Sequence, residues 1–415
     1  MSVSTNKEQI AALLSRGVDE IIGKEDLEKK LQSGKQLRIK LGIDPTSPHL
    51  HLGRSIPLLK LRDFQELGHK IVFIIGNFTG VIGDTSDKDS ERPMLEDNTI
   101  AHNMKEYAAQ AGKIIDLDQC EVRYNSEWLS SLTYGEIGRQ ANAFSVAEFI
   151  ARDNIKRRLD DGKRVSLREM LYPLMQGYDS VAVQADVELG GTDQRFNLLA
   201  GRVLQQEYKQ EPQAIIMGPL VEGTDGRKMS SSWGNTINVT ESPNEMFGKV
   251  MSIQDELIIK YFSLMTRVPM ELVQQYAQDM KEGANPKEYK MKLGFELVRF
   301  YHSEEAAHLA NAYFIDTFAN KQIPTEMPLI RPQNYKLIPT LVESGLAKST
   351  SDALRLISGG GIKVNGKKVF PFVPVSEFNE DGSVPGYDLK PGDTVQNLEP
   401  GDIIQKGKRF FVRIT

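Results

Sequence analysis

A short polar turn at the start of an apolar helical pattern has the composition of an anion-binding site. Residues 48–55 read PHLHLGRS and follow a predicted strand. A helix N-terminus carries unpaired N–H groups and a partial positive charge, so it attracts phosphates, and Gly53 lets a base or sugar approach the backbone. We therefore expect His51 and Thr46 to donate hydrogen bonds to phosphate oxygens. A surface turn whose histidines cap the helix is an equally common interpretation of this stretch alone.

Two further loops follow apolar strands and carry cations beside hydroxyls or carboxylates. Residues 226–232, GRKMSSS, place a lysine next to three serines, and such a loop can close on a triphosphate and neutralise the leaving pyrophosphate. Residues 83–92, GDTSDKDSER, form a charged loop after a buried strand. For each pattern alone, a solvated surface loop is the ordinary alternative. The candidate triphosphate contacts in the loop at 226–232 are Lys228, Met229, Ser230, Ser231 and Ser232.

A third group of polar residues falls on one face of a predicted helix. Tyr172, Gln176 and Asp179 are spaced i, i+4 and i+7, so their side chains share one side of the helix. A phenol, an amide and a carboxylate are unusual on a core-facing surface, and together they suit a small ligand with an amine and a hydroxyl. The sequence GGTDQ at 190–194 then opens the next helix with a glycine turn and an acid–amide pair. These features indicate a pocket.

The elements that must position these groups alternate between strand and helix patterns. Strand patterns occupy 37–43, 70–76 and 213–221, and helical patterns occupy 53–67, 99–115, 134–161 and 193–208. Apolar strands that alternate with crossover helices predict a doubly wound parallel sheet. Helical periodicity continues over 243–320, three prolines mark a linker at 321–335, and the remaining residues mix both patterns. We therefore predict an α/β Rossmann-like catalytic domain, an α-helical domain and a small α+β domain.

The composition is ordinary for a globular protein in water. Of 415 residues, 40% are hydrophobic and 26% are charged. Cys120 is the only cysteine, which excludes an internal disulfide framework and a zinc site built from several cysteines, and suits a reducing cytosol. No apolar run approaches the roughly 20 residues that span a bilayer, so we expect a cytoplasmic protein without membrane contact. The net charge of −5 divides into +3 from Arg331 onward and −8 before it, which is consistent with a nucleic-acid contact at the C-terminal end.

The order of these motifs resembles that of class I aminoacyl-tRNA synthetases, which carry HIGH and KMSKS signatures at the places of PHLHLG and KMSSS. With GIDPTSPHLHLG, GDTSDKDSER, LYPLMQGYDSV and GGTDQRFN, the chain is similar to bacterial tyrosyl-tRNA synthetases from about residue 35 to 245. Arg54 replaces the last histidine of HIGH, Ser231 replaces the second lysine of KMSKS, and Thr85 replaces the proline of GDPSG. Arg54 thus adds a cation at the helix start, where it could serve phosphate or ribose oxygens.

The resemblance implies three domains and an activity. The domains are a class I catalytic domain at 1–235 with a connective insertion at about 125–170, an α-helical domain at 236–325 that contacts the anticodon stem, and an RNA-binding domain at 335–415. The implied activity is that of a tyrosine–tRNA ligase, which forms tyrosyl-adenylate and pyrophosphate from tyrosine and ATP and then transfers tyrosine to the 3′ end of tRNA(Tyr). ATP is expected as a substrate with Mg²⁺, without a tightly bound cofactor or a protein-ligated metal. The family dimerises at the insertion, so a homodimer is expected.

Residue roles follow from the resemblance position by position. Asp179 matches the carboxylate that accepts the phenolic hydroxyl, and Lys40 stands where some members place a tyrosine beside that hydroxyl. The other tyrosine contacts are Asp84, Tyr172 and Gln176 at the ammonium and Gln194 near the carboxylate. The positions that line the adenosine are Asp44, Gly53, Gly191 and Asp193. The groups around the β- and γ-phosphates are Thr46, His51, Lys88, Arg92 and Lys228, with Arg54 as an additional cation.

The last domain has a local argument of its own. The stretch SDALRLISGGGIKVNGKKV is similar to the RNA-binding fold of ribosomal protein S-four. Its cations surround a GGG turn and an Asn-Gly hairpin at 365–366, and such a hairpin could present them to a phosphate backbone. The candidate RNA contacts are Arg355, Lys363, Lys367 and Lys368.

Two alternatives to an active tyrosine enzyme stay open. A non-catalytic RNA-binding paralogue of the same fold would explain the altered signatures, but it has no need of the ligand pocket or of cations such as Lys88 and Arg92. Tryptophanyl-tRNA synthetases share the fold, but an indole N–H does not require the polar row from Gln176 to Asp179 in this form.

Overall fold

The computed structural model describes residues 3–84, 97–319, 327–369, 397–407 and 410–415. The chain divides into two compact units, Met1–Ala307 and His308–Thr415. The sequence-based boundary between 235 and 236 falls inside the first unit and stays a prediction. Nowhere in the described ranges does a helix have both the length and the apolar character needed to span a bilayer.

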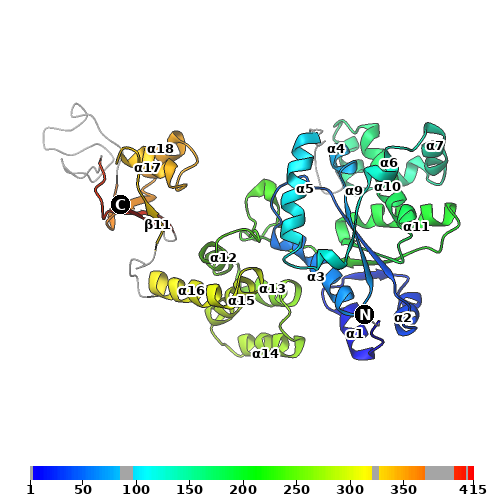
Figure 1. Cartoon of the computed structure of the whole chain (residues 1–415), viewed down its shortest axis with the longest axis horizontal. Coiled ribbons are helices and arrows are strands. Elements are labelled where there is room, and N and C mark those ends of the chain that lie inside the picture. The colour runs from blue at the N-terminus through cyan, green and yellow to red at the C-terminus, as the bar shows by residue number, and fades with distance from the viewer. Residues whose placement is uncertain (1–2, 85–96, 320–326, 370–396, 408–409) are drawn as a thin grey trace. The chain divides into compact units, whose positions relative to one another are not determined.

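Within the described residues, the first unit is built around a six-stranded sheet with the order β1-β6-β5-β2-β3-β4 (Figure 1). Its strands are β1 (Glu20–Ile22), β2 (Arg38–Ile43), β3 (Lys70–Ile75), β4 (Glu121–Tyr124), β5 (Val187–Gly191) and β6 (Ala214–Gly218). The strands β2 to β6 pair in parallel, and β1 pairs antiparallel with β6 at the edge. The doubly wound parallel sheet predicted from the sequence is confirmed.

Helices cover both faces of this sheet (Figure 1). They are α1 (Lys7–Ser15), α2 (Lys24–Gln32), α3 (Leu52–Glu66), α4 (Thr79–Ile82), α5 (Asp97–Ala111), α6 (Ser126–Leu129), α7 (Tyr134–Asn142), α8 (Val146–Ile150), α9 (Asp153–Asp160), α10 (Leu167–Ala182) and α11 (Arg195–Glu207). The connections through α3 and α5 run across the sheet in one direction, and those through α10 and α11 run in the other. Because such crossovers are right-handed, the two pairs of helices lie on opposite faces.

The sequence accounts for the closest helix contact of this unit. α10 begins at a capping box formed by Ser166 and Glu169. It then packs tightly on α11 at two glycines: a Cβ on Gly177 would lie 3.0 Å from the backbone of Ala200, and a Cβ on Gly201 would lie 2.9 Å from Ser180 Oγ of α10. This close approach brings the polar face of α10 onto the ends of the strands.

Several elements differ from the sequence patterns. The helical pattern at 134–161 forms three helices, because Ser145 caps α8 and Arg152 has an extended backbone before α9. The strand pattern at 213–221 ends at Gly218, as β6. The sequence patterns do not predict β1, β4 and β5, which are short and carry charged residues among the apolar ones.

A helical segment follows the sheet. Its helices are α12 (Pro243–Val250), α13 (Ile258–Met265), α14 (Met270–Lys281), α15 (Pro286–Tyr301) and, continuing into the second unit, α16 (Glu304–Phe314). Buried residues along α13, including Tyr261, Phe262 and Met265, anchor this segment within the first unit. The helical pattern predicted for 243–320 is thus divided into separate helices.

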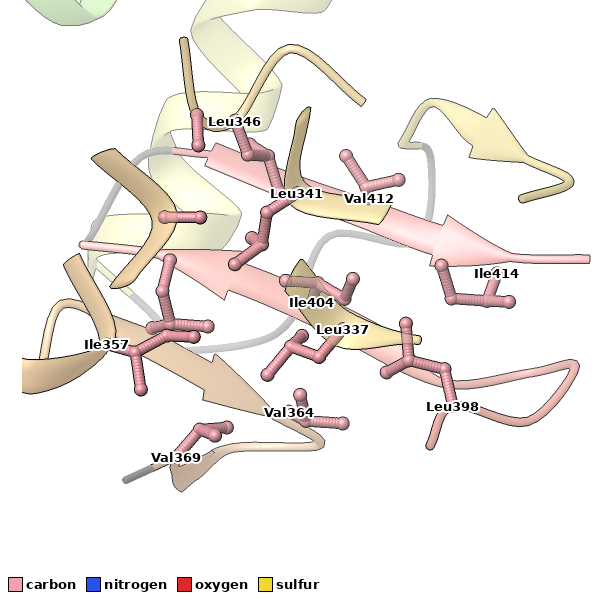
Figure 2. Packing of buried hydrophobic residues seen from close by; sticks show 13 residues of the cluster. Leu337, Leu341, Leu346, Ile357, Val364, Val369, Leu398, Ile404, Val412 and Ile414 are labelled. Carbon is pink, nitrogen blue, oxygen red and sulfur yellow. The ribbon is translucent and has the colours of Figure 1, made fainter. Parts of the chain in front are cut away.

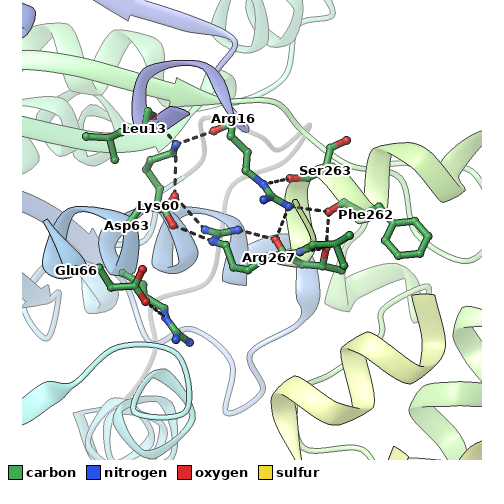
Figure 3. Close-up of polar contacts among 11 residues, drawn as sticks. Leu13, Arg16, Lys60, Asp63, Glu66, Phe262, Ser263 and Arg267 are labelled. Carbon is green, nitrogen blue, oxygen red and sulfur yellow. Dashed lines mark hydrogen bonds and ion pairs between the residues drawn. The ribbon is translucent and has the colours of Figure 1, made fainter. Parts of the chain in front are cut away.

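Three cations and one carboxylate fasten α3 to its neighbours (Figure 3). Lys60 donates to carbonyl oxygens at the C-terminal end of α1, at 2.6 Å each. Arg16 donates to carbonyl oxygens at the end of α13, at 2.8–3.2 Å. Asp63 accepts two hydrogen bonds from Arg267, at 2.8 and 3.1 Å. Burial lowers the pKa of Lys60 to about 8, which shows that its ammonium is largely desolvated. The cluster thus joins α1 and α3, which cover the sheet, to α13 of the helical segment.

The second unit is a small α+β structure, as predicted. Its described strands are β7 (Leu329–Ile330), β8 (Ile362–Val364), β9 (Lys367–Lys368), β10 (Ile403–Lys406) and β11 (Phe410–Ile414), and its further helices are α17 (Leu337–Glu343) and α18 (Thr350–Ser358). The sheet order is β7-β11-β10-β8-β9. Figure 2 shows its core, in which Leu337 and Leu341 of α17 and Ile357 of α18 pack against Ile404 and Val412 of the sheet.

Candidate active site

A pocket of about 600 Å³ lies at the carboxyl ends of β2 and β5. These neighbouring strands feed α3 and α11 toward opposite faces, so the pocket lies where the strand order reverses, which is where doubly wound sheets bind ligands. Its size suits a nucleotide-sized ligand. The predicted residues that line it are Asp44, Thr46, His51, Gly53, Arg54, Asp84, Tyr172, Gln176, Gly191, Asp193, Gln194, Lys228, Met229, Ser230, Ser231 and Ser232.

The start of α3 presents two polar side chains to this pocket. His51 is the residue before the helix and is 6% exposed. Burial, together with the charges of Arg54 and Lys228, lowers the pKa of His51 to about 3, so the imidazole is neutral at pH 7. Within the described residues, His51 Nδ1 and Arg54 Nη1 are buried without a hydrogen-bond partner. A Cβ on Gly53 would lie 3.1 Å from His51 Nδ1, so glycine permits this arrangement of the ring.

The loop with KMSSS packs against the start of α3. The Gly53 N–H donates to Met229 Sδ at 3.2 Å, which joins the two signatures directly. Asn235 shapes the loop, because its side chain accepts from the Ser230 N–H at 2.8 Å and donates to the Lys228 carbonyl at 3.0 Å. The loop therefore holds its lysine at the pocket.

The lysine of this loop already has an acidic partner. Lys228 Nζ lies 3.0 Å from Asp193 Oδ2, and both side chains are partly exposed. Asp193 is a residue predicted to contact the adenosine, so the two groups that would meet opposite ends of ATP contact each other here.

Asp179 is a buried carboxylate behind the pocket lining. It is 3% exposed and accepts hydrogen bonds from Trp128 Nε1 at 2.8 Å and Asn125 Nδ2 at 3.4 Å. Burial raises the pKa of Asp179 to about 7, although the charge of Lys40 and the two donors oppose this rise. A buried acceptor whose ionisation is poised near neutral pH is typical of a functional site.

Hydrogen bonds connect Asp179 to the other end of the pocket. Asn125 also donates to Thr79 Oγ1 at 2.8 Å, and Thr79 donates to Asp44 Oδ1 at 2.6 Å. Tyr172 donates its hydroxyl to Asp44 Oδ2 at 2.7 Å. Sequence reasoning does not find Thr79 and Asn125, because they lie at the starts of the one-turn helices α4 and α6, outside the motifs, and only the strand order brings them together.

The remaining predicted tyrosine contacts are held by acidic neighbours. Gln194 donates to Asp84 Oδ2 at 2.8 Å, and Gln176 donates to Glu188 Oε1 at 3.2 Å. Lys40 is fully buried and lies 2.9 Å from Glu188, beneath the pocket lining rather than on it. The structure thus places Lys40 behind the residues that would touch a ligand.

Two predicted phosphate contacts lie outside the described residues. Lys88 and Arg92 fall in the stretch 85–96, for which the structure gives no description. Their proposed contacts with ATP therefore stay predictions.

Three of the four predicted RNA contacts lie on the β8–β9 hairpin of the second unit. Lys363 on β8 lies opposite Lys368 on β9, and Lys367 lies opposite Val364. Like charges that face each other across strands are unfavourable, so this pairing indicates a surface for an anion. The turn between the strands, 365–366, has two positive φ angles, 51° and 81°, as the predicted Asn-Gly hairpin requires. Arg355 on α18 is 82% exposed.

Relatives with known names match nearly the whole chain. Tyrosine–tRNA ligase of Thermotoga maritima is 47% identical over 368 residues, which cover 88% of this chain and 92% of that protein. Tyrosine–tRNA ligase of Shewanella oneidensis is 46% identical over 414 residues, which cover 98% of each chain.

Solved structures share the fold over about three quarters of this chain. The C-terminally truncated mitochondrial tyrosyl-tRNA synthetase of Coccidioides posadasii has a TM-score of 0.60 at 22% identity and covers 74% of this chain and 92% of its own. Tyrosyl-tRNA synthetase of Archaeoglobus fulgidus, complexed with L-tyrosine, has a TM-score of 0.59 at 21% identity and covers 73% of this chain and 99% of its own. At this level of identity, the likeness speaks for the fold alone.

Two family models match the sequence, one over most of the first unit and one within the second unit. The family of tRNA synthetases class I (W and Y) matches residues 32–319, and the S4 domain matches residues 339–375. With most of the chain matched by the first model and nearly all of it by relatives of the same name, the chain belongs to the tyrosyl-tRNA synthetase family of class I tRNA synthetases.

Proposed function

We propose that this chain is a tyrosine–tRNA ligase, which activates tyrosine with ATP to tyrosyl-adenylate and pyrophosphate and then transfers tyrosine to the 3′ end of tRNA(Tyr). One observation carries the proposal: the two signatures meet, with the Gly53 N–H on Met229 Sδ at 3.2 Å, at the pocket that holds the polar face of α10. The names of the relatives support the same activity.

The first step needs positioning and charge neutralisation rather than a general base. The carboxylate of tyrosine is ionised at pH 7 and attacks the α-phosphorus in line with the leaving pyrophosphate. Neutral His51 and Thr46 donate to phosphate oxygens, while Arg54 and Lys228 neutralise the charge that develops on pyrophosphate. Lys88 and Arg92 act with them in the same role.

ATP binding gives the Lys228–Asp193 ion pair new partners. Lys228 moves to the β- and γ-phosphates, and Asp193 accepts from the ribose hydroxyls. Asp44, Gly53 and Gly191 line the adenosine together with residues 229–232. Mg²⁺ enters with ATP, bound mainly through phosphate oxygens and water, as a hard cation prefers.

The polar face of α10 selects the amino acid. Asp84, Tyr172 and Gln176 surround the ammonium, and Gln194 lies near the carboxylate. Asp179 accepts the phenolic hydroxyl, so an amino acid without that hydroxyl leaves a buried acceptor without its partner.

The second unit supplies contacts to the tRNA. Lys363, Lys367, Lys368 and Arg355 bind phosphates of its backbone, and the helical segment after the sheet contacts the anticodon stem. The reaction takes place in the cytoplasm, which the single cysteine of the chain suits.

The connective insertion is the face through which two copies associate. Tyr134, Val146 and Leu167, on α7, α8 and α10, are 95%, 74% and 83% exposed. Large apolar residues at such exposure mark an interaction surface. Val146→Asp should therefore produce monomers in sedimentation experiments on a dimeric parent protein.

ATP–pyrophosphate exchange tests the activity. The chain should support exchange with tyrosine, and tryptophan and phenylalanine should support far less, because neither offers a phenolic hydroxyl to Asp179. Exchange with none of the three would favour the non-catalytic RNA-binding paralogue. Faster exchange with tryptophan than with tyrosine would make the chain a tryptophan enzyme of the same family.

A further inference from the structure

A buried ion pair lies under the amino-acid end of the pocket. Lys40 on β2 and Glu188 on β5 are direct neighbours in the register of the parallel sheet. Their charged groups are 2.9 Å apart, and the side chains are 0% and 2% exposed. Glu188 reaches the pocket lining, whereas Lys40 lies behind it.

Protein groups fill the hydrogen-bonding positions of the pair. Lys40 Nζ donates to Glu188, to the Gln176 carbonyl at 2.9 Å and to Ser180 Oγ at 2.7 Å. Glu188 also accepts from Gln176 Nε2 at 3.2 Å, from Ser180 Oγ at 3.0 Å and from Gln213 Nε2. An ammonium has three donors and a carboxylate has about four acceptor positions, so protein groups fill the positions of the two charged groups.

The position of this network indicates a role in the site as well as in stability. Well-packed hydrophobic residues are usually at least as stable as a buried ion pair. Here both charges contact one turn of α10, from Gln176 to Ser180, and that turn carries Asp179 between them. The pair therefore touches the segment that faces both polar ends of tyrosine.

We propose that the Lys40–Glu188 pair sets the polarity of the tyrosine pocket: Glu188 turns the side-chain Oε1 of Gln176 toward the substrate ammonium, and Lys40 keeps Asp179 an acceptor for the phenolic hydroxyl. The inference rests on the proposed function and deepens it. Lys40 and Glu188 become positioning residues, which act through Gln176 and Asp179.

The orientation of Gln176 follows from hydrogen-bond chemistry. An amide donates at Nε2 and accepts at Oε1, and a carboxylate such as Glu188 only accepts. Gln176 must therefore direct Nε2 to Glu188, which leaves Oε1 for the pocket. An ammonium only donates, so it needs this orientation.

The ionisation of Asp179 depends on the pair with opposite signs. Lys40, from β2, lowers the pKa of Asp179, and Glu188, from β5, raises it, while burial raises it most. The donors Trp128 and Asn125, from the α6 side, also favour the charged form, and Tyr172 is the further titratable group on α10. Removing Lys40 and removing Glu188 should therefore affect the phenol end in opposite directions, which a merely structural role does not predict.

Binding titrations with three ligands separate the two ends. The ligands are tyrosine, phenylalanine, which lacks the hydroxyl, and 3-(4-hydroxyphenyl)propionate, which lacks the ammonium. In the full chain, Lys40→Met should reduce the preference for tyrosine over phenylalanine about tenfold at pH 7, equivalent to one pKa unit, and the preference should return at higher pH. Glu188→Gln should not lower that preference, since it removes a charge that raises the pKa of Asp179, but it should reduce the preference for tyrosine over the propionate about tenfold.

Matched variants keep the test decisive. Arg158→Met breaks another buried ion pair, with Glu169 at the start of α10, and should lower the melting temperature while both preferences stay unchanged. If Lys40→Met does not fold, the double variant Lys40→Met/Glu188→Gln avoids an unpaired buried charge. It should lose the preference over the propionate and show a smaller loss of the preference over phenylalanine.

Folded variants in which both preferences stay within about twofold of the parent, or fall together by the same factor, would overturn the inference. The proposed function is tested separately, since the parent chain must first bind tyrosine and support ATP–pyrophosphate exchange. Its failure there would be visible before any variant is compared.

Discussion

Asp179 is 3% exposed, and burial raises its pKa to about 7 from the ordinary 3.8. Between about pH 4 and pH 7 the unfolded chain therefore binds fewer protons here than the folded chain, so this residue lowers stability as pH rises through that window. Asp179→Asn should be more stable than the parent at pH 8, by about 2–4 kcal/mol, with little difference near pH 4. Urea unfolding at both pH values measures this. A variant that is less stable at pH 8 would contradict the argument.

The same substitution should remove the preference for tyrosine over phenylalanine. The Asn amide is neutral, and one of its ends must face the Trp128 and Asn125 donors. Exchange assays with the two amino acids would show near-equal rates. A stabilised but unselective protein would mean that this carboxylate is retained for recognition, at a cost in stability.

Arg54 is the departure from the family signature whose role can be tested most directly. It lines the pocket, and its Nη1 is buried without a partner among the described residues. Arg54→Ala should slow tyrosyl-adenylate formation about 100-fold, as loss of one preorganised donor does, with the KM for tyrosine nearly unchanged. Arg62→Ala, which removes an arginine of the same helix that pairs with Glu66 outside the pocket lining, should leave the rate as it is. Equal rates for parent and Arg54→Ala would make Arg54 a surface substituent.

At the scale of elements, α3 must keep its N-terminus at the pocket, and the charged cluster at its other end ties it to α13 (Figure 3). Arg267→Met removes two hydrogen bonds from the partly buried Asp63. The free energy of unfolding should fall by about 1–3 kcal/mol, since bonds to charged groups are involved. Arg299→Met breaks an exposed pair with Glu296 on α15 and should cost under about 1 kcal/mol. Equal costs for the two variants in urea unfolding would show that the cluster adds no more than a surface pair.

Local sequence patterns predict the main strands of the sheet and one side of the pocket. The apolar runs of β2, β3 and β6 and the glycine–histidine turn before α3 mark the sheet and one side of the pocket. Spacing alone places Tyr172, Gln176 and Asp179 on one face of α10; Tyr172 and Gln176 line the pocket, and Asp179 lies behind its lining. Lys228 belongs to a recognisable loop, and it lies where that loop meets α3.

Other parts of the site depend on contacts between distant segments and leave no local signal. Glu188 stands in a short strand and becomes the partner of Lys40 only through the register of β2 with β5. Thr79 and Asn125 join the network because β3 lies beside β2 and β4 lies beside β3. The close contact of α10 with α11 depends on Gly177 and Gly201. The residues next to them in the sequence do not show that these glycines serve helix packing rather than a turn.

At the scale of the whole molecule, the proposed function assigns amino-acid activation to the first unit and contact between cations and the tRNA backbone to the second. The cations Lys363 and Lys368 face each other on β8 and β9, far along the chain from every residue of the pocket. Each phosphate contact releases counterions, so tRNA affinity should fall steeply with salt. Lys363→Gln/Lys368→Gln should weaken tRNA binding and reduce the slope of log K against log salt by about 1 per lysine.

The control for this pair of substitutions makes the same change in charge in the first unit. Lys24→Gln/Lys29→Gln removes two exposed cations from α2, so any general effect of net charge on tRNA affinity appears there. Fluorescence titrations of labelled tRNA at four salt concentrations give both slopes, and ATP–pyrophosphate exchange with tyrosine should stay unchanged in both variants. An unaltered slope for the β8–β9 variant would place the tRNA contact elsewhere. A lower exchange rate would show that the two units do not act independently, because a cation of the second unit would then influence a step that involves no tRNA.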